Sequence, residues 1–311
     1  MECFMLPKNT LKKMSFFLIT ACLGLFTYDH VFDIRLSNLQ EKLPYNSEWK
    51  LKDLGAEKNL EVTKILNQPF FYTSEGGQSY VFSSKDNQYV LKLFKYKRFR
   101  PAWFVKVLPN IEIFKHFKAQ HTSKRAAKLQ RVLMGHQVAY EYIQEESGLV
   151  FVQLNSSSTP NKIQLIDKIG LIHPIDLSET AFVLQKKGEM LRHNFAYLLK
   201  DGQVQTVKER ISQVFAMYLS EYQKGIHDED HGVMQNFGFI GTRPFHLDLG
   251  KFAVDESYKK PEIYQPDLIK VANRIRTWMY KYYAIHAQEV EKHMEDELSK
   301  IFQKPIKLVV S

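Results

Sequence analysis

The chain has almost no cysteine. Its 311 residues hold only Cys3 and Cys22, and both precede the globular part. The body of the protein therefore cannot form an internal disulfide and offers no thiolate ligands for a metal. The sequence also lacks a hydrolase-type order of Ser, His and Asp, a G-x-S-x-G turn, internal repeats and low-complexity tracts. These absences exclude disulfide scaffolds, thiolate zinc proteins, repeat proteins and serine hydrolases of that type.

What remains is a globular composition with a basic balance. Hydrophobic residues make up 44% and charged residues 25% of the chain, so disorder is not expected. The formal charge of +9 suits anionic partners such as nucleotides, nucleic acid or anionic lipid. A cluster of Lys and Arg among aromatics in residues 92–106 fits a nucleic-acid or membrane patch, but also a solvated strand end. We favour the solvated strand end and expect no nucleic-acid partner.

The N-terminus carries a basic flank before an uncharged run at residues 14–28. This pattern is typical of a secretory signal or a membrane anchor. As a helix, the run would cover roughly 22 Å, which is short for a hydrocarbon core of about 30 Å. We expect residues 1–28 to form a hydrophobic helix that associates with the membrane as a signal-anchor or short transmembrane helix.

Other interpretations of this N-terminal segment stay open. It could be a signal peptide whose cleavage releases a secreted protein, and ITAC, ending at Cys22, resembles a bacterial lipoprotein cleavage box. It could also be a buried apolar helix, or Met14 could be the true start. The flanking lysines would direct the body of the protein across the membrane.

The remaining pattern predicts an α+β chain of two lobes. Residues 29–66 are interpreted as a connector with a helix near 57–66. Residues 67–186 are predicted to form a strand-rich N-lobe with one long helix between 101 and 146, in which Gly135 is an interior weakness. Residues 187–311 are predicted to form a helical C-lobe.

The first chemical motif is Gly76-Gly77-Gln78-Ser79 between two predicted strands. Glycines let the backbone approach phosphate oxygens and direct N–H groups at them. Taken alone, the motif is also explained by an ordinary hairpin turn.

The second motif is Lys92 in the apolar strand YVLKLFK. A lysine is costly to bury without an anionic partner, and a nucleotide phosphate or a helix carboxylate would serve. An edge lysine that faces solvent is the alternative.

The third motif is KGIHDEDHGVMQNFGFIGTRPFHLDLGKF, which follows a predicted helix at 211–224. Asn236 and Asp248 are twelve residues apart, and FGFI and PFHLDLG are predicted to form a hairpin between them. Such a hairpin would bring an amide oxygen and a carboxylate to one Mg²⁺, a cation that prefers oxygen ligands and substrate phosphates. A polar surface loop is the alternative.

Taken together, these motifs resemble the protein-kinase-like superfamily over roughly residues 70–280. S-E-G-G-Q-S-Y-V lies over the glycine-rich loop, with Gly76 on its second glycine, and Lys92 lies on the lysine of V-A-I-K. KGIHDED lies over K-G-I-I-H-R-D, which puts Asp230 at the catalytic aspartate. Asn236 matches the loop asparagine one residue late, and Asp248-Leu249-Gly250 matches Asp-Phe-Gly.

The resemblance implies a phosphotransferase that uses ATP and Mg²⁺, with an unknown acceptor. It assigns Gly76, Gly77, Ser79 and Lys92 to the phosphates, Glu141 (or Glu145 or Glu146) to the lysine, Asn236 and Asp248 to Mg²⁺, and Asp230 to the acceptor hydroxyl, with Asp228 as a rival base.

Departures from the family pattern keep alternatives open. No His-Arg precedes Asp230, no Ala-Pro-Glu follows Gly250, and Asp267-Leu268 resembles a helix start in aminoglycoside- and lipid-type small-molecule kinases. The main alternative is a catalytically impaired pseudokinase that serves as a membrane-associated binding or scaffolding module. A third hypothesis is a basic, membrane-tethered interaction protein without the kinase fold.

Overall fold

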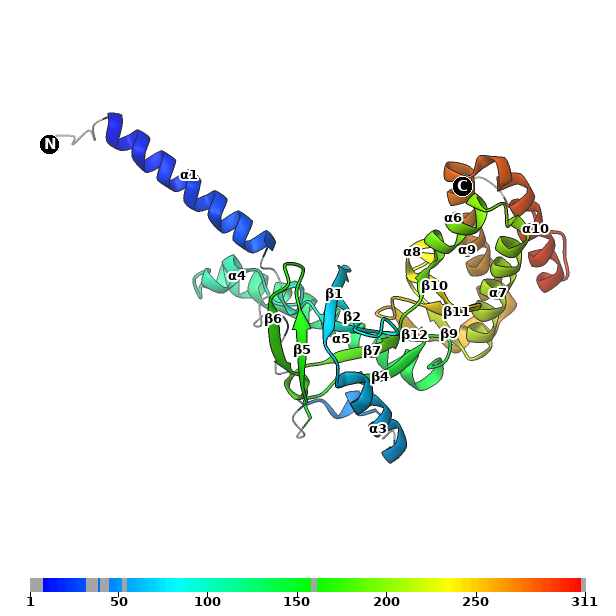
Figure 1. The fold of residues 1–311 in the computed structure, drawn as a ribbon, viewed down its shortest axis with the longest axis horizontal. Helices are drawn as coiled ribbons and strands as arrows, with labels where there is room; N and C mark the ends of the chain where they lie inside the picture. The colour runs from blue at the N-terminus through cyan, green and yellow to red at the C-terminus, as the bar shows by residue number, and fades with distance from the viewer. Residues whose placement is uncertain (1–7, 32–38, 40–44, 52–54, 158–160, 309–311) are drawn as a thin grey trace.

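The computed structural model describes residues 8–31, 39, 45–51, 55–157 and 161–308. Figure 1 shows a curled sheet with one long helix beside it and a group of helices at the C-terminal end. The mixed α+β class and the helical C-terminal part predicted from the sequence are confirmed. The division into domains at residues 28, 66 and 186 stays a prediction.

The uncharged N-terminal run lies in helix α1 (Lys8–Val31), and its side chains at positions 12–24 are exposed. Within the described ranges, no helix is both long enough and apolar enough to cross a membrane. The membrane association expected for residues 14–28 stays a prediction. Helix α3 (Gly55–Leu66) begins two residues before the helix predicted for the connector.

The sheet has seven strands in the order β4-β7-β3-β2-β1-β5-β6. The three strands expected around the Glu-Gly-Gly and Lys-Asp-Asn turns are β1, β2 and β3, which pair antiparallel. The hairpin β5–β6 was not predicted, and it extends the sheet because β5 pairs in parallel with β1. The strand bounds are β1 Phe70–Glu75, β2 Ser79–Ser84, β3 Tyr89–Phe94, β4 Leu149–Gln153, β5 Lys162–Ile166, β6 Ile172–Asp176 and β7 Phe182–Lys186.

The long helix predicted before β4 is α5 (Glu112–Tyr142), and the short helix α4 (Trp103–Val107) precedes it. Gly135 lies where this helix meets the chain after β11. A Cβ atom on Gly135 would lie 2.5 Å from the carbonyl oxygen of Leu249. Glycine has a low helix propensity, but at position 135 the missing side chain lets helix α5 approach the Asp-Leu-Gly segment closely.

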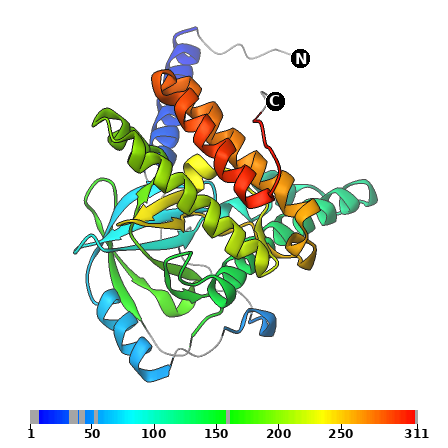
Figure 2. The same cartoon turned by 90° about the vertical axis from the view of Figure 1, so that its right-hand side faces the viewer.

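The helical part has its own apolar core, built from residues between Leu191 and Leu308. The single helical pattern expected over 265–302 is two helices, α9 and α10, because Tyr283 between them has a non-helical backbone. Figure 2 shows these two helices side by side. The remaining bounds are β8 Glu189–Met190, α6 Leu191–Lys200, α7 Val204–Gln223, β9 Ile226–Asp228, α8 Val233–Asn236, β10 Phe237–Ile240, β11 Arg243–His246, β12 Phe252–Val254, α9 Pro261–Tyr282 and α10 Ala284–Phe302.

Candidate active site

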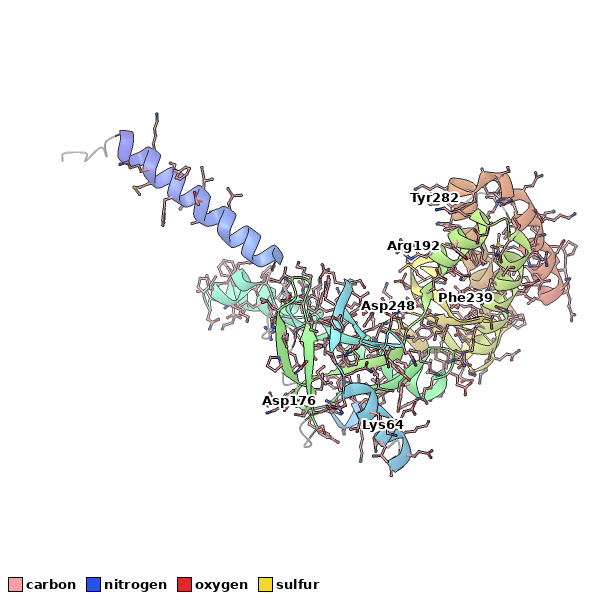
Figure 3. All side chains as sticks on the ribbon, viewed as in Figure 1. Lys64, Asp176, Arg192, Phe239, Asp248 and Tyr282 are labelled. Atoms are coloured by element: carbon pink, nitrogen blue, oxygen red, sulfur yellow. The ribbon has the colours of Figure 1, made fainter. Side chains whose placement is uncertain are left out.

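A cleft of about 970 Å³ lies between the sheet and the helical part. Its volume falls at the upper end of the roughly 300–1,000 Å³ typical of ligand sites. Five of the residues predicted from the sequence line the cleft: Gly76, Ser79, Lys92, Asn236 and Asp248. Gly77 does not line it. Figure 3 places Asp248 where the two parts of the molecule meet.

The hairpin β10–β11 brings Asn236 and Asp248 together, as predicted. Phe237 pairs with His246 in its register, and the amide of Leu247 donates to the carbonyl of Asn236 at 2.7 Å. The two candidate Mg²⁺ ligands are therefore neighbours at the end of the hairpin. The Asp248 carboxylate also accepts a hydrogen bond from the Gly250 amide at 3.1 Å, which fixes its position.

Lys92 lies on β3, with paired strands on both sides, so it is no edge lysine. Its ammonium donates to the carbonyl oxygen of Leu247, the residue before Asp248. Burial lowers the pKa of Lys92 to about 8, and the charge of Asp248 partly offsets this effect. The lysine is thus buried, and the nearby charge that favours its protonated form is that of Asp248, the metal-ligand candidate.

Glu141 does not reach Lys92, and this prediction is wrong. Its side chain is exposed and accepts a hydrogen bond from Gln137 at 3.2 Å. Five residues earlier, about 140° around the helix, His136 is the residue of α5 that lines the cleft. The alternatives also lie elsewhere, since Glu146 pairs with Lys224 and Glu145 approaches Arg243 at 3.9 Å.

His136 is a site residue that the sequence did not reveal. It is 4% exposed, and its Nδ1 lies 2.7 Å from the carbonyl oxygen of Val132, so Nδ1 carries the proton and donates. Burial lowers its pKa to about 4. His136 is therefore neutral at physiological pH and adds no second positive charge next to Lys92.

The loop predicted to cover phosphates also touches the Asp-Leu-Gly segment. The side-chain carboxamide of Gln78 lies beside Gly250, so a Cβ atom there would displace the Gln78 side chain. The carbonyl oxygen of Gln78 accepts a hydrogen bond from the Lys95 amide at 2.8 Å. Gln78 therefore links the loop to the segment that holds Asp248.

Asp230 lies on the loop after β9 and lines a hollow that adjoins the cleft. The ammonium of Lys251 donates to its Oδ2 at 2.9 Å. Burial would raise the pKa of Asp230, but the hydrogen bonds from Lys251 and Asn236 outweigh it and lower the pKa. Asp230 is thus ionised at neutral pH. Lys251 directly follows Gly250, and this adjacency was the only sequence signal for it.

Asp228, the rival base, lies at the end of β9 and is 4% exposed. Its Oδ1 accepts a hydrogen bond from the Asp230 amide at 2.8 Å. Burial raises the pKa of Asp228 to about 7. This geometry makes Asp228 a support for the Asp230 loop.

The raised pKa of Asp228 predicts a pH-dependent stability. The folded state holds a proton that the unfolded state releases near pH 4, so folding loses stability as the pH rises from about 4 to about 7. The stability advantage of Asp228→Asn over the wild type should therefore increase by roughly 2–3 kcal/mol as the pH rises from 5 to 7. Above pH 7 this advantage should level off. Urea unfolding across this range measures it. Glu229→Gln, a half-exposed neighbour, is the control, and a gain that is equal at both pH values contradicts the prediction.

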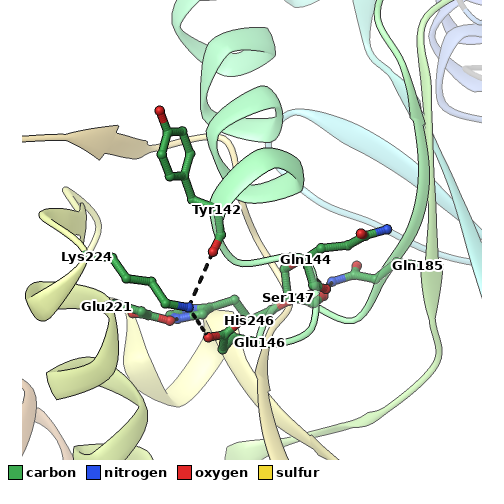
Figure 4. Close-up of polar contacts among 8 residues, drawn as sticks. All are labelled: Tyr142, Gln144, Glu146, Ser147, Gln185, Glu221, Lys224 and His246. Carbon is green, nitrogen blue, oxygen red and sulfur yellow. Dashed lines mark hydrogen bonds and ion pairs between the residues drawn. The ribbon is translucent and has the colours of Figure 1, made fainter. Parts of the chain in front are cut away.

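Figure 4 draws residues of a polar network that connects the sheet with the helical part of the molecule. Gln185 on β7 donates to the carbonyl oxygens of Ser147 at 2.6 Å and His246 at 2.7 Å. His246 in turn lies 2.7 Å from the carboxylate of Glu221 on α7, and both side chains are fully buried. The strand that leads to Asp248 is therefore anchored to the sheet and to the helices at once.

Comparisons with known proteins found only low-scoring similarity to solved structures. No family model and no curated protein match the chain. Solved structures of WbdD align with about three quarters of it. One structure of WbdD has a TM-score of 0.35 and 13% identity, covering 76% of this chain and 46% of that one. Another, of the bifunctional kinase–methyltransferase WbdD, has a TM-score of 0.34 and 14% identity, covering 74% and 43%. The chain spans less than half the length of either.

Proposed function

We propose that the chain is an ATP- and Mg²⁺-dependent phosphotransferase of the protein-kinase-like type. One observation carries the proposal: Gly76 and Ser79 of the loop, Lys92 of β3, and Asn236 and Asp248 of the hairpin line the same cleft. These residues come from segments up to 172 positions apart, and their joint placement was expected from the family pattern. A surface loop or a plain hairpin turn would not require this convergence.

Each residue then has a role that its position allows. The loop of Gly76 and Ser79 would cover the phosphates, and Lys92 would donate to phosphate oxygens in place of the Leu247 carbonyl. The adenine would lie beside Gln185 and residues 186–188, which line the same cleft. Phosphoryl transfer depends mainly on positioning and charge neutralisation, so this small set suffices.

The donor set fits Mg²⁺ when a nucleotide is bound. Asn236 and Asp248 supply one amide and one carboxylate oxygen, and Mg²⁺ is commonly held by one or two carboxylates together with substrate phosphates. Among the described residues there is no group of three or more acidic, His or Cys ligands that would hold a metal without the nucleotide. The bound ion would neutralise charge on the phosphates. Asn236 donates its amide to Asp230, which leaves its oxygen for the ion.

A catalytically impaired nucleotide-binding module is the second candidate. One observation favours it: Lys92 bonds to a backbone carbonyl, and Glu141, which the family pattern assigns to it, bonds to Gln137 instead. Asp230, which is ionised and could accept a proton from an acceptor hydroxyl, favours the enzyme.

The first test is a melting shift with ATP, with and without Mg²⁺. A ligand present at about 100 times its Kd should stabilise the wild type by roughly 2.7 kcal/mol. Asp248→Ala should lose the Mg²⁺-dependent part of the shift, because it removes the only carboxylate of the proposed ligand pair. Asp201→Ala, an exposed aspartate at the end of α6, should keep the full shift. No shift in the wild type would contradict the proposal.

A further inference from the structure

A second hollow of about 640 Å³ adjoins the cleft at the Asp230 loop. Gln235 lines both the hollow and the cleft, so the two spaces meet at this residue. The hollow is bordered on its other side by helix α9, through Lys270, Arg274, Trp278 and Lys281. A molecule bound here would lie beside the carboxylate of Asp230.

The charge of this hollow is strongly one-sided. Three cationic side chains line it and one carboxylate, that of Asp230. Helix α9 buries Leu268, Val271, Ala272, Ile275 and Met279 against the core, so its cations occupy the other face. At about 1.5 Å per residue, Arg274 lies about 6 Å along the axis from Lys270 and about 10 Å from Lys281.

These cations are only partly neutralised by the protein. Lys270 lies 3.4 Å from Asp267, which is buried and also bonded to His231 and Tyr222. In the part of the chain that the structure describes, no ion pair joins Arg274 or Lys281 to a carboxylate within 4.0 Å, although the charge of Arg274 helps to lower the pKa of Asp230. Like charges around a recess attract anions and raise their local concentration.

Aromatic surface completes the hollow. Trp278 lines it and also a smaller recess of about 360 Å³ that adds Arg192 and His193. Tyr282, which lines both, is 57% exposed. Figure 3 shows Asp248, Arg192 and Tyr282 in succession along one edge of the helical part. The basic and aromatic surface therefore continues directly from the proposed phosphate-transfer centre.

We propose that this hollow binds the phosphate acceptor, and that the acceptor is a hydroxyl compound that already carries a phosphate group. The inference rests on the proposed function for the reaction itself. In that reaction the hydroxyl oxygen forms a bond to the γ-phosphorus of ATP, the bond to ADP breaks, and the hydroxyl proton passes to Asp230. Arg274 and Lys281 hold the acceptor's own phosphate.

Two sources could supply this chemistry: a soluble phosphate ester or a phospholipid headgroup with free hydroxyls. Glycerol 3-phosphate and vesicles of phosphatidylglycerol present the same group in these two forms. Glycerol keeps the hydroxyls and lacks the negative charge, and phosphatidylcholine vesicles lack both the net negative charge and the free hydroxyl. The four probes therefore separate the effect of the phosphate charge from the effect of a lipid surface.

The experiment titrates the full chain with glycerol 3-phosphate and follows tryptophan fluorescence, because Trp278 lines the hollow. Arg274→Ala/Lys281→Ala should weaken binding at least about tenfold, since charge-assisted hydrogen bonds to phosphate are lost. Lys58→Ala/Lys64→Ala removes the same charge from exposed positions on α3 and should bind as wild type; Figure 3 places Lys64 far from Tyr282. Glycerol should not bind measurably.

Cosedimentation with vesicles decides the source. A lipid headgroup is the acceptor if the protein is retained on phosphatidylglycerol vesicles, the α9 double variant loses this retention and the α3 double variant keeps it. A soluble ester is the acceptor if only glycerol 3-phosphate binds. Binding of neither probe, or equal binding by both double variants, overturns the inference. If Mg-ATP shifts the melting temperature in that case, only this inference fails. If the probe binds but Mg-ATP gives no shift, the anion site stands and the proposed function fails.

Discussion

Replacing Gly135 by alanine is expected to destabilise the protein by about 2 kcal/mol, within the range of about 1–3 kcal/mol typical of overpacking. The added methyl would lie 2.5 Å from the Leu249 carbonyl oxygen and 2.8 Å from the Gly250 carbonyl carbon. Both contacts are with backbone, which cannot rotate away as a side chain can. The helix or the Asp-Leu-Gly segment must therefore shift.

The sign of this effect makes the prediction sharp. Glycine in the middle of a helix normally costs roughly 0.5–1 kcal/mol relative to alanine, so helix propensity alone predicts a gain. Ser123→Ala is a matched control, because Ser123 is exposed on the same helix and should gain about 0.5 kcal/mol. Urea unfolding of both variants gives the comparison. A Gly135→Ala variant more stable than wild type would contradict the packing described here.

The same substitution should also weaken nucleotide binding. Leu249 and Gly250 directly follow Asp248, whose carboxylate is fixed by the Gly250 amide. Displacing this backbone moves the candidate metal ligand away from Asn236. The Mg²⁺-dependent melting shift should therefore decrease in Gly135→Ala by more than in Ser123→Ala.

Local patterns predicted the elements that carry the site. The aromatic and β-branched runs around Gly76 and Lys92 form the expected antiparallel strands, since alternation and turn residues act over a few positions. The sequence runs FGFI and PFHLDLG likewise predict the hairpin between Asn236 and Asp248, and the structure has it. In these cases, the information lies within a short stretch of chain.

The residues that were missed depend on relations between distant segments. The family pattern assigns Glu141 to Lys92, but in the structure α5 is turned so that Gly135 faces Leu249, more than one hundred residues away. That rotation turns His136 toward the cleft. The parallel pairing of β5 with β1 and the approach of Arg274 to Asp230 are also long-range, and no spacing in the sequence reports them.

Asp230→Asn is expected to reduce turnover by about 10²–10⁴-fold while leaving nucleotide binding intact, because it removes a proton acceptor and keeps the shape of the side chain. Asp230 lines the hollow and is absent from the residues that line the nucleotide cleft. The Mg-ATP melting shift should therefore be that of the wild type. Turnover is measured as ADP formed from Mg-ATP, first with water and then with glycerol 3-phosphate as acceptor.

Two neighbouring carboxylates make the assignment specific. Glu229→Gln removes the same charge from the same loop and should leave turnover unchanged, since Glu229 lines neither space. Asp228→Asn should retain turnover, because its oxygen can still accept the hydrogen bond from the Asp230 amide. Loss of turnover in Asp228→Asn together with normal turnover in Asp230→Asn would make the buried carboxyl the base.

The wild type itself decides between the two candidate functions. If the wild type binds Mg-ATP and forms no ADP with either acceptor, the result favours the impaired module. The hydrogen bond of Lys92 to the Leu247 carbonyl would then belong to a site that binds nucleotide without turnover. Turnover that depends on Asp230 would mean that catalysis proceeds without the helix glutamate that the family pattern assigns to Lys92. The negative charge that normally orients the lysine would then be supplied by Asp248, whose charge already favours the protonated form of Lys92.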